Sequence, residues 1–310
     1  MDDGAVPEPM RPWKKSAAGA YRWLGRGLAI AAVVFLALQG WRHRHTAMGA
    51  LEELSVARIA SALLLYIAAC LVLSLAWPLT LRAIGSPGIP LRPLAALHLR
   101  AQLSKYLPGG VFHFAQRHLE SLRWGFSHRE LTVALAVEAA LLLGTASLVA
   151  IGIAGDPRLA LLPDWLLPLT YAMPLILPVA WLALRVWSRC VDNGMRGIML
   201  VPLLCVVGID LVFFLLSGLA LLTLGNLAGD ASFWLGWLAM AWLCGYLVPG
   251  APGGIGIREA VLVMGLAHAM GSGQALVLAL AYRVVTLSAD SVCTVLGFLL
   301  NGRAAKAEGN

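Results

Sequence analysis

Residues 198–224 read IMLVPLLCVVGIDLVFFLLSGLALLTL, an apolar run whose single ionisable side chain is Asp210. A helix needs about 20 mostly apolar residues to cross the hydrocarbon of a bilayer. Helices and closed barrels are the structures that satisfy every backbone hydrogen bond there. The run lacks the two-residue alternation of barrel strands. It therefore predicts a membrane-spanning helix.

Five other apolar runs are long enough to span a membrane, at residues 24–40, 59–81, 131–153, 165–187 and 275–300. Charged residues make up 13% of the chain, about half the roughly 25% that is usual for soluble domains. The sequence thus predicts an all-α polytopic membrane protein with six full spans, occupying residues 24–300. The flanking segments 1–23 and 301–310 are predicted to be polar tails.

Two further stretches are helical in pattern but broken by proline and glycine. Residues 93–122 break at Leu107-Pro108-Gly109-Gly110, and residues 232–270 break at Pro249-Gly250-Ala251-Pro252-Gly253-Gly254. Proline removes a backbone donor and clashes with the preceding turn, and glycine permits sharp reversals. Each stretch is predicted to form a helical hairpin that is re-entrant or makes a pair of crossings.

The two breaks also suggest an internal repeat. Tyr106-Leu107-Pro108-Gly109 and Tyr246-Leu247-Val248-Pro249-Gly250 begin 140 positions apart, and the same offset superposes the flanking apolar runs. We interpret the halves, about 59–190 and 198–300, as repeats of span, broken hairpin and span. The alternative is a coincidence of helix spacing. Broken segments at matching positions of two halves are a pointer to a transporter's binding site.

The distribution of basic residues predicts the orientation. With the N-terminus inside, 17 of the 23 Lys and Arg residues fall in cytoplasmic segments and five in external ones, as the positive-inside rule requires. Both ends are then cytoplasmic, and the two hairpins enter from opposite sides, as in an inverted repeat. The net charge of +7 is accounted for by these loops. We predict no nucleic-acid partner, since the basic residues are not grouped on a polar domain.

The second break has the composition of an anion site. Glycines let a backbone approach a phosphate closely, and the free N–H groups at the start of the following helix favour negative charge. The predicted phosphate-binding residues here are Gly253, Gly254, Gly256, Arg258 and Glu259. The alternative is a hairpin tip whose small residues simply allow close packing.

The first break carries a parallel set of residues, Lys105, Gly109, Gly110, His113 and Arg117. His113 and Arg117 are four positions apart and share one helix face. A basic face beside a glycine tip suits a lipid phosphate. The alternative is an interfacial helix whose cations touch headgroups without specificity.

Four ionisable residues lie deep in apolar runs: Glu138, Asp210, Arg283 and Asp290. Such residues cost at least about 2.5–3.5 kcal/mol at a helix centre on insertion scales, so they should face the protein interior and pair. We expect Arg283 and Asp290 each to pair with another helix, with Asp210 or Glu138 as candidate partners. The set forms either a polar pathway or proton relay, or structural contacts between helices.

An enzyme would need a nucleophile or an acid–base constellation. The sequence has no metal-ligand spacing, Walker loop or hydrolase motif, and we predict no metal, no cofactor and no catalytic residue. The five cysteines form no disulfide pattern.

With these motifs in view, the chain resembles the lysylphosphatidylglycerol synthase transmembrane-region family, or flippase-like domain. The resemblance is carried by Tyr106-Leu107-Pro108-Gly109-Gly110 with His113 and Arg117, by Pro252-Gly253-Gly254-Ile255-Gly256-Ile257-Arg258-Glu259-Ala260, and by Ala281-Tyr282-Arg283. It implies lipid handling in a bacterial inner membrane. No synthase domain is expected in this chain, so lysine transfer is not expected either.

The leading hypothesis is a flippase that moves an anionic phospholipid or a polyprenyl-linked sugar between leaflets, by facilitated or ion-coupled movement. The alternatives are a non-transporting accessory subunit that partners an envelope-synthesis enzyme, and an intramembrane transferase that uses Glu120 or Asp210.

Overall fold

The computed structural model describes residues 54–84, 91–107, 111–157, 199–248 and 251–307, together with a few single residues elsewhere, and describes side chains up to residue 300. The predicted tail at 1–23, the predicted spans at 24–40 and 165–187, and the tip residues Gly109 and Gly110 lie wholly or largely outside these ranges. Within them the chain is helical and contains no strand.

Four helical segments are long and apolar enough to cross a membrane: Val56–Ala83, His128–Ile153, Leu200–Gly225 and Ser272–Leu300. They confirm the spans predicted at 59–81, 131–153, 198–224 and 275–300. The first consists of α3 (Val56–Leu73) and α4 (Ala76–Ala83), the second of α7 (His128–Ala150) and the short η3 (Ile151–Ile153), the third is α9 (Leu200–Gly225), and the fourth belongs to α12 (Ser272–Ala307). In its described part, the chain is an all-helical membrane protein.

Both broken stretches contain an α-helix on each side of the Pro/Gly segment. The first contains α5 (Leu91–Arg100), η1 (Leu103–Tyr106) and α6 (Phe112–Ser121), followed by η2 (Leu122–Trp124). The second contains α10 (Ala231–Leu247), η5 (Pro252–Gly254) and α11 (Ile257–Met270). Helices therefore end on either side of both Pro/Gly segments, as predicted.

Local capping explains where the helices begin. Ser127 caps α7 by accepting a hydrogen bond from the Glu130 N–H at 3.2 Å, and the Glu130 carboxylate accepts one from the Ser127 N–H at 2.8 Å, a reciprocal capping box. Asp230 caps α10 in the simpler way, through the Ser232 N–H. At the other end of α9, Asn226 takes the left-handed conformation that closes a helix.

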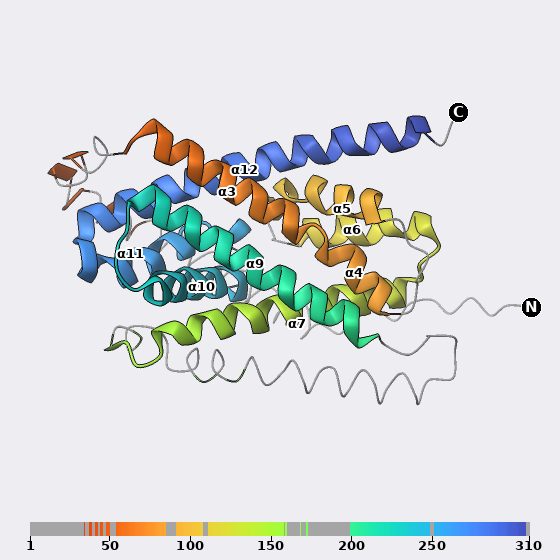
Figure 1. Ribbon diagram of the computed structural model, residues 1–310, viewed down its shortest axis with the longest axis horizontal. Coiled ribbons are helices and arrows are strands. Elements are labelled where there is room, and N and C mark those ends of the chain that lie inside the picture. The colour runs from red at the N-terminus through yellow and green to blue at the C-terminus, as the bar shows by residue number, and fades with distance from the viewer. Residues whose placement is uncertain are drawn as a thin grey trace, which may run out of the picture.

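The two broken stretches extend toward opposite ends of the molecule from tips that lie close together. Figure 1 shows α5 and α6 at the end that holds the C-terminus, and α11 at the far end, with α12 running past both. Along α12, Arg283 contacts the second break, Asp290 the first, and Gly297 packs on α5. These three residues are spaced seven apart, which is about 10 Å along a helix. The two breaks therefore contact α12 at points about two turns apart.

The tips of the two stretches touch. A Cβ at Gly253 would lie 2.5 Å from the Tyr106 ring, and Gly253 has a φ of +56°, which only glycine adopts at low cost. The Tyr106 hydroxyl donates to Asp290 at 2.6 Å. Tyr106 thus fills the space that the glycine leaves and joins both tips to α12.

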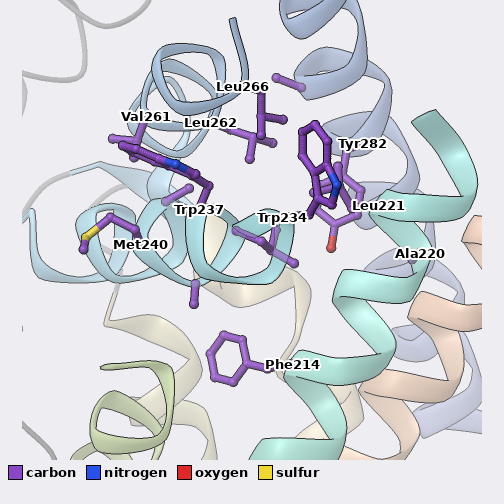
Figure 2. Close-up of a cluster of buried hydrophobic side chains, with 14 of the residues drawn as sticks. Phe214, Ala220, Leu221, Trp234, Trp237, Met240, Val261, Leu262, Leu266 and Tyr282 are labelled. Atoms are coloured by element: carbon purple, nitrogen blue, oxygen red, sulfur yellow. The ribbon is translucent and has the colours of Figure 1, made fainter. Parts of the chain in front are cut away.

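An aromatic core holds the second broken stretch against the spans. Figure 2 shows Trp234, Trp237 and Met240 of α10 facing Val261, Leu262 and Leu266 of α11, with Tyr282 of α12 and Phe214 of α9 beside them. Gly265 contacts the Trp237 indole so closely that a Cβ there would overlap the ring. In contrast, large apolar side chains on the outer faces of the spans remain exposed, as expected beside lipid; among them are Leu64, Val201, Leu215, Val284 and Phe298.

Candidate functional site

A cavity of about 390 Å³ lies between the two breaks and the spans. Eight of the residues predicted to form a site line it: Lys105, His113, Arg117, Glu138, Asp210, Gly253, Gly254 and Arg258. Glu259 and Arg283 line a smaller cavity of about 40 Å³ that shares Arg258 with the larger one. The structure therefore brings the basic residues of both breaks to one interior space, although they lie more than 130 positions apart in the sequence.

Arg117 is buried and paired. Its Nη1 lies 2.6 Å and 2.8 Å from the two carboxylate oxygens of Glu138, and 3.1 Å from Nδ1 of His98. Burial lowers the pKa of His98, and the neighbouring guanidinium lowers it further. We therefore assign His98 as the neutral imidazole, with Nδ1 as the acceptor, rather than as a cation paired with Glu138. The ion pair links α6 to α7.

Aromatic rings form the walls around Arg117. Its guanidinium carbon lies 4.8 Å from the centre of the Trp77 ring and 5.5 Å from that of Phe114, distances at which a cation is attracted to a ring face. Trp77 is held in turn by a 3.3 Å hydrogen bond from its indole nitrogen to Ser121. The Nε of Arg117 is buried and has no hydrogen-bond partner among the described residues, so this side chain keeps an unused donor there.

Asp290 binds the tip of the first break. Lys105 Nζ lies 2.8 Å from Asp290 Oδ2, and the same oxygen accepts the Tyr106 hydroxyl. Lys105 also donates to Gln102 at 3.0 Å. Burial acts to lower the pKa of Lys105, but the Asp290 carboxylate more than offsets it, so the net direction is upward. Lys105 is therefore a cation committed to α12.

Arg283 binds the second break. Its Nε lies 3.2 Å from Glu259, and its Nη2 donates to the Gly253 carbonyl at 3.2 Å. The second oxygen of Glu259 accepts the Gly256 N–H at 2.6 Å. The expectation that Arg283 and Asp290 pair with Asp210 or Glu138 was wrong. Arg283 pairs with Glu259 and Asp290 pairs with Lys105, both of which belong to the broken stretches. Both do pair outside their own helix, as expected.

The two ion pairs that follow the breaks have opposite polarity. After the first break, an arginine on the hairpin helix α6 pairs with a glutamate on the span α7. After the second, a glutamate on the hairpin helix α11 pairs with an arginine on the span α12. In each case the helix that follows the break is tied to the next span by a buried charge pair.

Arg258 differs from the other interior cations. No carboxylate lies within ion-pair distance of it in the part of the chain that the structure describes, and its Nε is buried without a partner. Its guanidinium lies 5.3 Å from the centre of the Trp242 ring. Gly245 and Gly254 flank the side chain, and a Cβ on either would collide with it. Two glycines on different segments therefore make a slot for a cation that has no counterion of its own.

Asp210 is the matching unpaired acid. It is 1% exposed and lines the cavity, and neither carboxyl oxygen has a hydrogen-bond partner in the described part of the chain. Most buried polar groups in proteins are hydrogen-bonded, so a carboxyl group with two unused oxygens calls for an explanation.

Several residues of this site carried no usable signal in the sequence. His98, Gln102, Trp242 and Tyr246 line the cavity but lie within ordinary helical or apolar stretches. Trp242 and Tyr246 are stacked, with ring centres 5.0 Å apart, a result of their spacing of four on α10. That spacing is equally common in a hydrophobic core, so it does not identify a site.

We expect Gly253→Ala to destabilise the protein more than Gly125→Ala. Both glycines have positive φ, +56° and +81°, so both substitutions carry the left-handed cost of about 1–2 kcal/mol. Only at Gly253 does the new methyl group meet a ring; nothing lies within 4 Å at Gly125. Thermal unfolding of the purified variants measures the difference. Equal losses would show that the Tyr106 contact does not hold the tips together.

No protein-family model matches the chain, and no curated protein is significantly similar to it.

Proposed function

We propose that this protein translocates an anionic phospholipid or a lipid-linked glycan between the leaflets of a bacterial inner membrane. The observation that supports the proposal best is Arg258, a cation with no carboxylate partner among the described residues, placed in a glycine slot beside a cavity. A phosphate group would supply the missing negative charge. The resemblance to the flippase-like family belongs to the same proposal.

The electrostatics of the cavity favour an anion over a neutral headgroup. Isolated charges are costly in a medium of low dielectric constant unless they are paired. Lys105 and Arg117 are neutralised by Asp290 and Glu138, whereas Arg258 is not. When a phosphate binds Arg258, the guanidinium and the phosphate each gain a partner of opposite charge. Neither then bears the desolvation cost of an unpaired charge. Hydrogen bonds to charged groups contribute roughly 1.5–3 kcal/mol each.

The proposed route follows the arrangement of the breaks. In this view the two hairpins form an inverted repeat, entering from the cytoplasmic and external sides, with both chain termini in the cytoplasm. Their tips meet at Tyr106 and Gly253, next to the cavity. A headgroup would enter on one side of this contact and leave on the other, while the acyl chains stay in lipid along the exposed apolar faces of the spans.

Reconstitution into liposomes tests the proposal. Purified protein is placed in phosphatidylcholine vesicles that contain a trace of fluorescent phosphatidylglycerol or fluorescent phosphatidylcholine, and an impermeant quencher is added outside. We expect the inner-leaflet fluorescence of the anionic probe to become accessible faster than in protein-free vesicles, with a smaller effect on the zwitterionic probe. No acceleration of either probe, together with co-purification of a stoichiometric synthesis enzyme, would favour the accessory-subunit role instead.

A further inference from the structure

Asp210 is a buried acid that the proposed phosphate site does not use. It sits within span α9, ten positions after Leu200, and neither of its oxygens accepts a hydrogen bond from the described residues. A carboxylate in this position would bear the full cost of desolvation, which hydrogen bonds or a cation normally offset. The neutral carboxylic acid is held at much lower cost.

Among the described residues, a second buried carboxyl group lies near Asp210. Glu138 of α7 is close enough to interact electrostatically with Asp210, and both line the cavity. α9 also packs against α3, α4, α10 and α12. Among the described side chains, these four elements carry ten titratable or charged groups: Arg58, Tyr66, Cys70, Arg82, Cys244, Tyr246, Tyr282, Arg283, Asp290 and Cys293. Of these, Tyr66, Cys70 and Tyr246 line the same cavity as Asp210.

Glu138 connects Asp210 to the anion site. Its charge is balanced by Arg117, through contacts of 2.6 Å and 2.8 Å to one guanidinium nitrogen. A phosphate in the cavity competes with Glu138 for Arg117, whose Nε makes no hydrogen bond within the described ranges. When Arg117 turns to the phosphate, Glu138 and Asp210 remain as neighbouring carboxyl groups without a cation. Two such groups cannot both ionise cheaply, so the pair holds a proton.

We propose that Asp210 is a proton-binding site coupled to the anion in the cavity: an anionic headgroup that withdraws Arg117 from Glu138 raises the affinity of Asp210 for its proton. The proton comes from water in the cavity and resides on a carboxyl oxygen of Asp210, shared with Glu138 once Arg117 is withdrawn. This coupling rests on the proposed function for its anion, but the proton site itself does not.

Infrared difference spectroscopy tests the proton site without any transport. The purified protein in phosphatidylcholine nanodiscs is titrated with base, and the carbonyl stretch of a protonated carboxylic acid is followed. We expect such a band at neutral pH, its loss at alkaline pH, and its absence in Asp210→Asn. A spectrum in which Asp210→Asn keeps the whole band would overturn the proposal. If Asp210→Asn does not fold, Asp210→Glu serves instead. The band should then shift in position, and an unshifted band would overturn the proposal.

The coupling is tested by repeating the titration in nanodiscs that contain phosphatidylglycerol. We expect the band to persist to higher pH than in phosphatidylcholine alone. Arg117→Gln should abolish this lipid dependence, because Glu138 then lacks its cation in both lipids. The exposed Arg123 provides the matched control: Arg123→Gln experiences the same surface charge of the lipid and should keep the dependence. A lipid dependence that is equal in the Arg117 and Arg123 variants would refute the coupling.

The two proposals fail in different ways. A carboxylic acid band that depends on Asp210, combined with no lipid movement in liposomes, would remove the flippase function and leave the proton site. Lipid movement without such a band would support the flippase function and remove the proton site.

Discussion

Replacing Arg117 with Met is expected to lower the free energy of unfolding by about 3–5 kcal/mol, the usual cost of breaking a buried ion pair from one side. Arg117 is 3% exposed and Glu138 is 5% exposed, so neither charge can turn to water when its partner is removed. The variant also leaves His98 without the donor that its Nδ1 accepts from. The remaining carboxylate must either stay uncompensated or take up a proton.

Replacing Glu138 as well should restore most of the free energy of unfolding that Arg117→Met loses. Arg117→Met with Glu138→Leu removes both charges, and replacing a buried pair with apolar side chains is often neutral or stabilising. Thermal unfolding of the wild type, the two single variants and the double variant gives the coupling energy directly. Arg123→Met, at an exposed position, is the control for losing an arginine as such. A double variant as unstable as Arg117→Met alone would show that Glu138 is not the partner that matters.

Replacing Arg258 with Gln is expected to slow the movement of the anionic lipid by roughly 10-fold to 100-fold while leaving thermal stability almost unchanged. A charge-assisted hydrogen bond contributes roughly 1.5–3 kcal/mol, and each 1.4 kcal/mol corresponds to about a tenfold change. Stability should be preserved because no ion pair is broken within the described residues; this contrast with Arg117 follows directly from the structure.

Two further variants sharpen the Arg258 experiment. Arg258→Lys keeps the charge but loses the planar fork that binds two phosphate oxygens, so an intermediate rate is expected. Arg123→Gln should transport the lipid at the wild-type rate. Full activity in Arg258→Gln would remove Arg258 from the phosphate site, and equal slowing of the anionic and zwitterionic probes would point to a general defect rather than to charge recognition.

Much of the fold could be predicted from local patterns. The run at 198–224 and its counterparts at 59–81, 131–153 and 275–300 became helices long enough to span a membrane, because length and apolar content decide a span almost independently of its neighbours. The breaks were predictable for the same reason: proline and glycine act on their own turn. The predicted spans 24–40 and 165–187 and the inverted repeat stay predictions.

The site was only partly predictable. The basic residues beside each break were identified by type, and the structure places Lys105, His113, Arg117 and Arg258 around one cavity. The sequence did not show which of these side chains pair with a carboxylate. Glu259 was grouped with the phosphate ligands, yet it accepts a hydrogen bond from the Gly256 N–H and pairs with Arg283. The sequence does not distinguish a residue that pairs within the protein from one that binds phosphate.

The sequence by itself therefore determined which segments can cross a membrane, where the two hairpins break, and which residue types lie at the breaks. These properties depend on a few neighbouring residues. The tertiary structure decided the pairing of charges that lie 21 to 185 positions apart, because only helix packing brings Lys105 to Asp290 and Arg117 to Glu138. Among the described residues, this pairing leaves Arg258 and Asp210 without a partner of opposite charge. These two residues are the proposed sites for phosphate and for a proton.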